Sequence, residues 1–152
     1  MAILIIPEFE ELSYRRKMHE SSRTMAFMHH TEPFPREKWD AFYRYVTEAD
    51  PAKECYRMIY CRGCCDIVGE VSYERISDTQ SAVCRVLIDA SKRNSGYGRS
   101  GVSLMEEEAA KHGISEFIFE ITADNPASGF LEHIGYTPKE KDGETLKYSR
   151  NI

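Results

Sequence analysis

The sequence predicts an α/β fold in which one mixed sheet contains both antiparallel and parallel strands. Its middle part holds three strand-like segments joined by short turns, as in an antiparallel meander. The third of these segments is apolar and is followed by a glycine-rich loop, an amphipathic helix and another strand, which is the pattern of a parallel crossover. The length of 152 residues fits one ordinary domain, and we expect residues 1–152 to form it.

The first third is predicted to contain one strand and two helices. The apolar start of the chain predicts a strand over Ile3–Glu10. Sparse apolar positions at helical spacing predict a helix over Ser13–Met28, after which Pro33 and Pro35 break the chain. A denser pattern of apolar residues, three and four apart, predicts a second helix over Arg36–Ala49.

The rest of the chain supplies the meander, the crossover and a final hairpin. The meander strands are expected at Tyr56–Tyr60, Asp66–Glu74 and Ala82–Asp89. After the loop Lys92–Gly98 come a helix over Arg99–His112, a strand over Glu116–Thr122, a short helix from Pro126 to Gly135, and hairpin strands at Tyr136–Lys139 and Glu144–Tyr148. The predicted order of elements is therefore β-α-α-β-β-β-α-β-α-β-β.

The composition argues against two classes of partner. The formal net charge is −5, whereas a nucleic-acid partner requires a basic surface. No stretch reaches the roughly 18–20 apolar residues of a membrane span, so we expect no membrane partner. Met1–Ile6 is short and no basic residue precedes it, which favours a strand over a signal peptide. Five cysteines without an export signal are typical of reduced thiols in the cytoplasm.

Three of the cysteines fall in the run Cys61-Arg62-Gly63-Cys64-Cys65, which contains a Cys-x-x-Cys spacing. A zinc site would need two further ligands, and Cys55 and Cys84 lack the paired spacing that such sites use. We therefore expect reduced thiols on a hairpin turn and no metal.

The glycine-rich loop is the main candidate for a binding site. Gly96 and Gly98 permit a positive φ and a close approach of the backbone to a ligand. The following helix begins with unpaired N–H groups at the positive end of its dipole, which suits a phosphate. Its first turn holds Arg99 and Ser100 and no acidic residue, which is consistent with an anion that comes from outside the chain. An ordinary strand-to-helix turn that needs glycine would account for the same loop residues about equally well.

The same residues also match the dinucleotide-binding pattern Gly96-x-Gly98-x-x-Gly101, with Asp124 at the distance of a ribose-binding acid. A Rossmann unit places these glycines after its first strand and needs further parallel strands beyond them. Here about ninety residues precede the loop, so the predicted topology disfavours a dinucleotide.

Taken together, these segments resemble the GNAT superfamily of N-acetyltransferases. The resemblance rests on Arg93-x-x-Gly96-x-Gly98 after an apolar strand and on the segment from Asp124-Asn125-Pro126 to Gly135-Tyr136. Val68-Gly69-Glu70-Val71 is also similar to the superfamily's third strand, and the order of elements matches along the whole chain.

The resemblance implies an enzyme that transfers an acetyl group from acetyl-CoA to an amine, on a small molecule or a peptide, while both substrates are bound. It is compatible with a homodimer. Backbone amides from Asn94 to Ser100 would hold the pyrophosphate, and Leu87 and Ile88 would contact the acetyl-pantetheine arm. The complete implied set for acetyl-CoA is Leu87, Ile88, Arg93, Asn94, Ser95, Gly96, Tyr97, Gly98, Arg99, Ser100, Asn125 and Ser128.

Candidate catalytic residues are three carboxylates. Because an acceptor ammonium must lose a proton, a base is needed, and the superfamily often uses a glutamate on a central strand. Glu70 is the first candidate, followed by Asp89 and Glu120. The alternative for Glu70 is a solvent-facing position, because it alternates with the polar residues Ser72 and Glu74.

One position departs from the superfamily. Many relatives carry a tyrosine in the last helix that protonates the leaving thiolate, and here that position is Leu131. Tyr136 is close in sequence but is expected to pack in the core. This departure keeps a second hypothesis open, in which the chain is a non-catalytic acyl-CoA sensor or interaction module.

Overall fold

The computed structural model describes all 152 residues and confirms the predicted mixed α/β fold and the order of its main elements. One sheet of seven strands has the order β1-β2-β3-β4-β5-β7-β6. The strands are β1 (Ala2–Ile5), β2 (Glu54–Cys61), β3 (Asp66–Arg75), β4 (Ser81–Ile88), β5 (Glu116–Thr122), β6 (Thr137–Asp142) and β7 (Thr145–Asn151). The α-helices are α1 (Leu12–His19), α2 (Trp39–Glu48), α3 (Tyr97–Ala110) and α4 (Ala127–His133).

The strand and the helix predicted within the first thirty residues are both longer than the elements that the structure contains. The first strand ends at Ile5, and a 3-10 turn over Phe9–Glu11 leads directly into α1. That helix ends at His19 rather than at Met28, because Ser21 and Ser22 follow it and the Ser21 hydroxyl binds the amide of Thr24 instead of continuing a helix. Met25 is buried from an irregular segment, so an apolar position can fit a helical spacing without lying in a helix.

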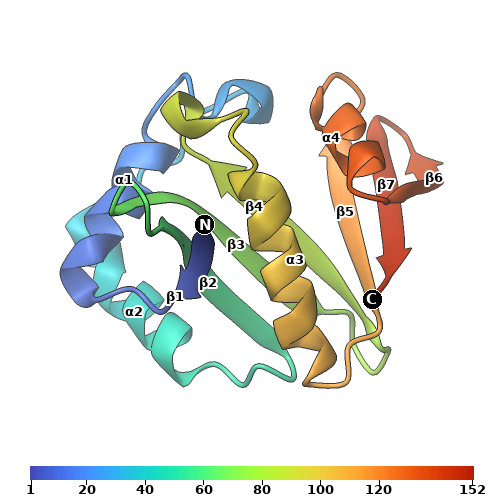
Figure 1. Cartoon of the computed structure of the whole chain (residues 1–152), viewed down its shortest axis with the longest axis horizontal. Helices are drawn as coiled ribbons and strands as arrows, with labels where there is room; N and C mark the ends of the chain where they lie inside the picture. The colour runs from blue at the N-terminus through green and yellow to red at the C-terminus, as the bar shows by residue number, and fades with distance from the viewer.

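The sheet opens at its centre (Figure 1). Strands β1 to β4 pair antiparallel along their length. The parallel pairing of β4 with β5 involves only three residue pairs and ends at Val83 opposite Ile118. Beyond that point the two strands diverge, so the edge of β4 that faces β5 has no strand partner there. This opening positions the candidate site.

Helices cover the two faces of the sheet unequally. Helix α3 crosses the face that carries the larger core, in which Val102 and Met105 are fully buried (Figure 1). Helices α1 and α2 cover the other face and enclose a smaller core around Trp39. Met58 and Ile59 illustrate the alternation along a strand, because Met58 packs in the smaller core and Ile59 in the larger one. No helix combines the length and the apolarity needed to cross a membrane.

Gly69 is required by the close approach of β3 and β4. A Cβ atom at this position would lie 2.4 Å from the carbonyl oxygen of Leu87, which is backbone and cannot move aside alone. We expect Gly69→Ala to lower the free energy of unfolding by at least the roughly 1–3 kcal/mol of an overpacked core, as measured by urea denaturation. Gly129→Ala is the control, because its Cβ would meet no atom within 4 Å in α4, and it should leave stability unchanged or raise it.

Candidate active site

The larger of two connected cavities lies between the diverging ends of β4 and β5. It has a volume of about 720 Å³ and is lined by the end of β4, the glycine-rich loop and the start of α4. Its charged lining residues are Lys92, Arg93 and Arg99, while no aspartate or glutamate lines it. A chain with net charge −5 therefore presents a cationic wall at this place, which suits an anionic ligand.

The loop before α3 presents free backbone donors to this cavity. The chain turns through positive φ at Asn94 (64°) and Gly96 (83°) before the helix begins at Tyr97. The amides from Asn94 to Arg99 have no hydrogen-bond acceptor within the chain, and the first turn of α3 contains no acidic residue. The Ser100 amide, by contrast, donates to the Gly96 carbonyl at 3.0 Å. The loop therefore offers free amide donors from Asn94 to Arg99, and the Ser100 amide, which the predicted anion site included, is not among them.

Arg93 fixes the position of this loop. Its Nε donates to the carbonyl of Ile88 at 3.1 Å and its guanidinium donates to the carbonyl of Thr24 at 2.7 Å. Burial lowers the pKa of Arg93. The side chain thus joins the end of β4 to the segment after α1, and its charge faces the cavity from a fixed place.

The structure brings most of the predicted cofactor residues together. Those that line the 720 Å³ cavity are Leu87, Ile88, Arg93, Asn94, Gly96, Tyr97, Gly98, Arg99 and Asn125. Ser95, Ser100 and Ser128 do not line it. The Asn125 side chain accepts a hydrogen bond from the Ala127 amide at 2.9 Å, which orders the entry to α4 beside the cavity.

A second cavity of about 450 Å³ opens on the side of the sheet that α1 and α2 cover. It shares with the first cavity the residues Met28, Val86, Leu87, Asn125, Ala127 and Phe130. Two ligands that entered from opposite faces would therefore meet where β4 and β5 separate.

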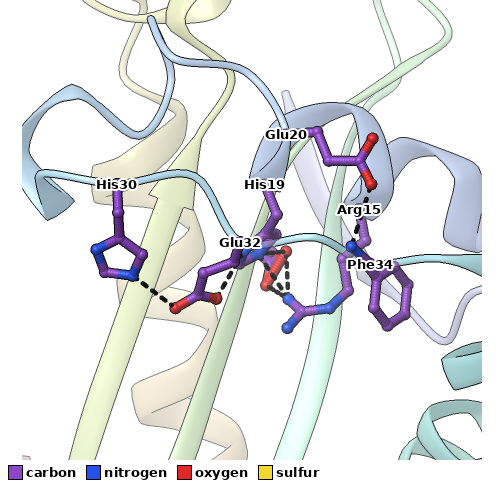
Figure 2. A network of polar contacts seen from close by, with 7 residues as sticks. Arg15, His19, Glu20, His30, Glu32 and Phe34 are labelled. Carbon is purple, nitrogen blue, oxygen red and sulfur yellow. Dashed lines mark hydrogen bonds and ion pairs between the residues drawn. The ribbon is translucent and has the colours of Figure 1, made fainter.

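Glu70 lies in this second cavity as the centre of a buried polar network. Its carboxylate accepts hydrogen bonds from Arg15, including one at 2.8 Å, and lies 3.0 Å from Nε2 of His19. The other ring nitrogen of His19 lies 3.2 Å from Glu32. Figure 2 shows His19 and Glu32 side by side in this network. Glu70 is 8% exposed, so the solvent-facing interpretation of this position was wrong. Helix α1, which carries Arg15 and His19, covers it.

The network keeps Glu70 ionised. Burial alone would raise its pKa, but the hydrogen bond with His19 and the charge of Arg15 outweigh burial and hold the pKa below its usual value. Glu70 in turn raises the pKa of Arg15 against the effect of burial. The Arg15 guanidinium also lies over the rings of Phe42, at 4.4 Å, and Phe34, at 5.0 Å.

The other two candidate bases differ in placement. Glu120 on β5 lines the second cavity and lies 3.6 Å from Lys147. Asp89 lines neither of the two cavities, and its carboxylate accepts hydrogen bonds from the amide and hydroxyl of Ser91. Leu131 is fully buried beside the second cavity. Tyr136 packs in the core as expected, where its hydroxyl donates to Glu106 at 2.6 Å.

Four residues of the second cavity carry functional groups that sequence reasoning did not single out. Arg15 and His19 reach Glu70 from a distant part of the chain, and Glu32 joins the network through His19, so no local spacing marks these contacts. Tyr56 is buried, and its hydroxyl has no hydrogen-bond partner within the chain. Burial raises the pKa of Tyr56 well above its ordinary value. An unpaired buried hydroxyl beside a cavity is a donor for a bound ligand.

The sequence matches the model of the family described as "Acetyltransferase (GNAT) family" over residues 15–136, which is most of the chain. The chain belongs to the GNAT acetyltransferase family. It is therefore a member of an acyltransferase family, and the predicted resemblance is confirmed. A search of curated proteins found no match. No group of three or more His, Cys, Asp or Glu side chains is placed to hold a metal ion.

Solved structures share the fold at low sequence identity. A domain from Methanocaldococcus jannaschii is 19% identical, with a TM-score of 0.80, and the match covers 100% of this chain and 99% of that one. The spermidine N-acetyltransferase from Vibrio cholerae, crystallised with CoA and spermine, is 13% identical over 99% of this chain and 95% of that one, with a TM-score of 0.80. The PaiA N-acetyltransferase from Thermoplasma acidophilum, in complex with coenzyme A, is 12% identical over 100% and 99%, with a TM-score of 0.75.

Proposed function

We propose that this protein is an N-acetyltransferase that transfers the acetyl group of acetyl-CoA to an amine while both substrates are bound. The observation that carries the proposal is the 720 Å³ cavity, which combines free amides from Asn94 to Arg99 with three cationic side chains and no carboxylate. Such a wall complements a pyrophosphate. The CoA complexes of two structural neighbours support the choice of coenzyme A.

The two cavities give acetyl-CoA and the acceptor separate approaches to one point. The pyrophosphate would bind the loop amides, and the pantetheine arm would run along Leu87 and Ile88, where the edge of β4 has no strand partner. The acceptor amine would enter through the 450 Å³ cavity beside Glu70. Direct attack of the amine on the thioester then needs no covalent enzyme intermediate, because both substrates reach the opening from opposite faces.

The acceptor ammonium must lose a proton before it attacks. Glu70 remains our first candidate for the base. Because the lowered pKa makes its carboxylate a weak proton acceptor, we propose that Glu70 takes the proton through a bridging water rather than directly. Glu120 is the second candidate, because it lines the same cavity. The placement of Asp89 outside both cavities leaves it without support as a base.

The test of this proposal is release of free thiol from acetyl-CoA with a panel of primary amines. We expect turnover with at least one amine, and a roughly 10²-fold lower kcat/KM in Glu70→Gln or Glu120→Gln, whichever removes the base. Glu140→Gln is a control, because Glu140 also lies beside Lys147 but lines neither of the two cavities. If neither candidate variant slows a wild type that does turn over, both assignments fail.

A non-catalytic acyl-CoA sensor is the second candidate function. It is favoured by Leu131, an apolar residue at the position where many GNAT relatives carry the tyrosine that protonates the leaving thiolate. Tight binding of acetyl-CoA without thiol release across the whole panel would establish the sensor. A dinucleotide binder would instead gain thermal stability from NAD, whereas we expect stabilisation by acetyl-CoA and not by NAD. We place this activity in the cytoplasm, on the ground of the cysteine content alone.

A further inference from the structure

Three cysteines lie at the turn between β2 and β3, and none of them lines either of the two cavities. Cys61 is the last residue of β2, and Cys64 and Cys65 lie in the turn that follows it. The Cys64 amide donates to the sulfur of Cys61 at 3.3 Å. The Tyr97 hydroxyl donates to the same sulfur at 3.2 Å and also lies 3.8 Å from the sulfur of Cys64. The sulfur atoms of Cys61 and Cys64 therefore both contact the Tyr97 hydroxyl group.

These contacts favour the thiolate form of Cys61. The neighbouring Cys64 thiol, the Tyr97 hydroxyl and the Cys64 amide together lower the pKa of Cys61 to about 7. A thiol with this pKa is substantially ionised at neutral pH, and the thiolate is the form that attacks a disulfide. Cys61 itself is only 5% exposed, whereas Cys64 is open to solvent. The two thiols are thus complementary, since one is accessible and the other is activated.

We propose that Cys61 and Cys64 form a redox-active dithiol, which a low-molecular-weight disulfide such as oxidised glutathione converts into an intramolecular disulfide. The exposed Cys64 thiolate attacks one sulfur of oxidised glutathione, and the first glutathione thiolate leaves. The Cys61 thiolate then attacks the Cys64 sulfur of the mixed disulfide and displaces the second glutathione. The protein dithiol loses two electrons and two protons, and one oxidised glutathione becomes two molecules of reduced glutathione.

The local backbone permits this closure. A disulfide needs Cα atoms about 4.4–6.8 Å apart, and the first and fourth residues of a tight turn lie within about 7 Å of each other. The hydrogen bond from the Cys64 amide to the Cys61 sulfur shows that the Cys61 side chain already points toward Cys64. Cys65 takes a different direction, because its thiol points toward the Arg62 carbonyl at 3.5 Å. This chemistry does not depend on acyl transfer, so the two proposals stand or fall separately.

The experiment is to incubate the native protein with oxidised glutathione, block the remaining thiols at acidic pH, and map the products by trypsin digestion and mass spectrometry. Trypsin cuts after Arg57, Arg62 and Arg75, so Cys61 lies on the peptide Met58–Arg62 and both Cys64 and Cys65 lie on Gly63–Arg75. We expect these two peptides to become cross-linked in the wild type. The cross-link should persist in Cys65→Ser, and Cys61→Ser should instead accumulate a stable glutathione adduct on Cys64.

Three results would overturn the proposal. They are a stable glutathione adduct in the wild type without the cross-link, a disulfide confined to Gly63–Arg75, and loss of the cross-link in Cys65→Ser. Because Cys61 is buried and its replacement can disturb the fold, Cys64→Ser provides a second test at an exposed position. Cys64→Ser should retain the wild-type circular dichroism spectrum and form no cross-link, and a persistent cross-link in this variant would also refute the pairing.

Discussion

Replacement of Glu70 by glutamine should lower the free energy of unfolding by about 3–5 kcal/mol, the usual loss when one partner of a buried ion pair is removed. Glutamine keeps the size of the side chain but leaves the Arg15 guanidinium charged, buried and without its carboxylate. The side chains of Arg15 and Glu70 are only 18% and 11% exposed, so water has little access to the guanidinium that loses its carboxylate partner. Urea denaturation of the wild type and the variant measures the loss, as a lower midpoint with an unchanged m-value.

The matched control is Glu74→Gln on the same strand. Glu74 lies four residues beyond Glu70, on the same face of β3, but it is exposed and has no ion-pair partner. Its replacement should change stability by less than about 0.5 kcal/mol. Equal losses in the two variants would show that the Glu70 network does not stabilise the fold.

The loss in Glu70→Gln should also depend on pH in a defined direction. The pKa of Glu70 is lowered in the folded protein, so its stabilising contribution is complete above the unfolded carboxyl pKa of about 4.3. The contribution is lost as the pH falls through the lower, folded value. We therefore expect the stability difference between wild type and Glu70→Gln to be constant near neutral pH and to shrink below about pH 4. A difference that grows with acidification would contradict the assigned direction of the shift.

Reversal of the charge of Arg99 should weaken coenzyme A binding about 10- to 100-fold, measured by calorimetric titration. This range corresponds to the roughly 1.5–3 kcal/mol of a hydrogen bond to a charged group. Arg99 lines the 720 Å³ cavity in the first turn of α3. Glutamate at this position places a carboxylate against the proposed pyrophosphate site. It should not unfold the helix, because an acidic residue is favourable near a helix N-terminus.

Lys111→Glu is the control for Arg99→Glu, because it makes the same change of charge at the opposite end of the same helix. Lys111 is 70% exposed and lies beside Glu108, away from the cavity. Its replacement should leave the Kd for coenzyme A nearly unchanged. A comparable weakening in both variants would mean that net charge, and not the helix start, governs binding.

The sequence predicted the parts of this molecule that local patterns encode. Gly96 and Gly98 mark the turn into α3, and the apolar runs mark the meander, so the fold and the loop could be predicted from spacing alone. The extent of α1 was overestimated because Met25 and Met28 continue a helical spacing across residues that form turns. Of these two residues only Met25 is buried, and it reaches the core from an irregular backbone.

The polar network around Glu70 could not be predicted, because its contacts join residues about fifty positions apart. Alternation along β3 places Glu70 with Ser72 and Glu74, which suggests solvent, and only the packing of α1 over that face reverses the conclusion. The same holds for the Tyr97 hydroxyl, whose contact with Cys61 crosses from the glycine-rich loop to a hairpin turn. Such contacts depend on tertiary packing and leave no periodic signal.

The central claim is that acyl-CoA binds in the cleft between β4 and β5 with its pyrophosphate on the start of α3. A crystal structure of the protein with acetyl-CoA tests it most directly. We predict that the pyrophosphate oxygens accept hydrogen bonds from amides between Asn94 and Arg99, and that the thioester lies where the two cavities meet near Leu87. A pyrophosphate bound away from these amides would contradict the account.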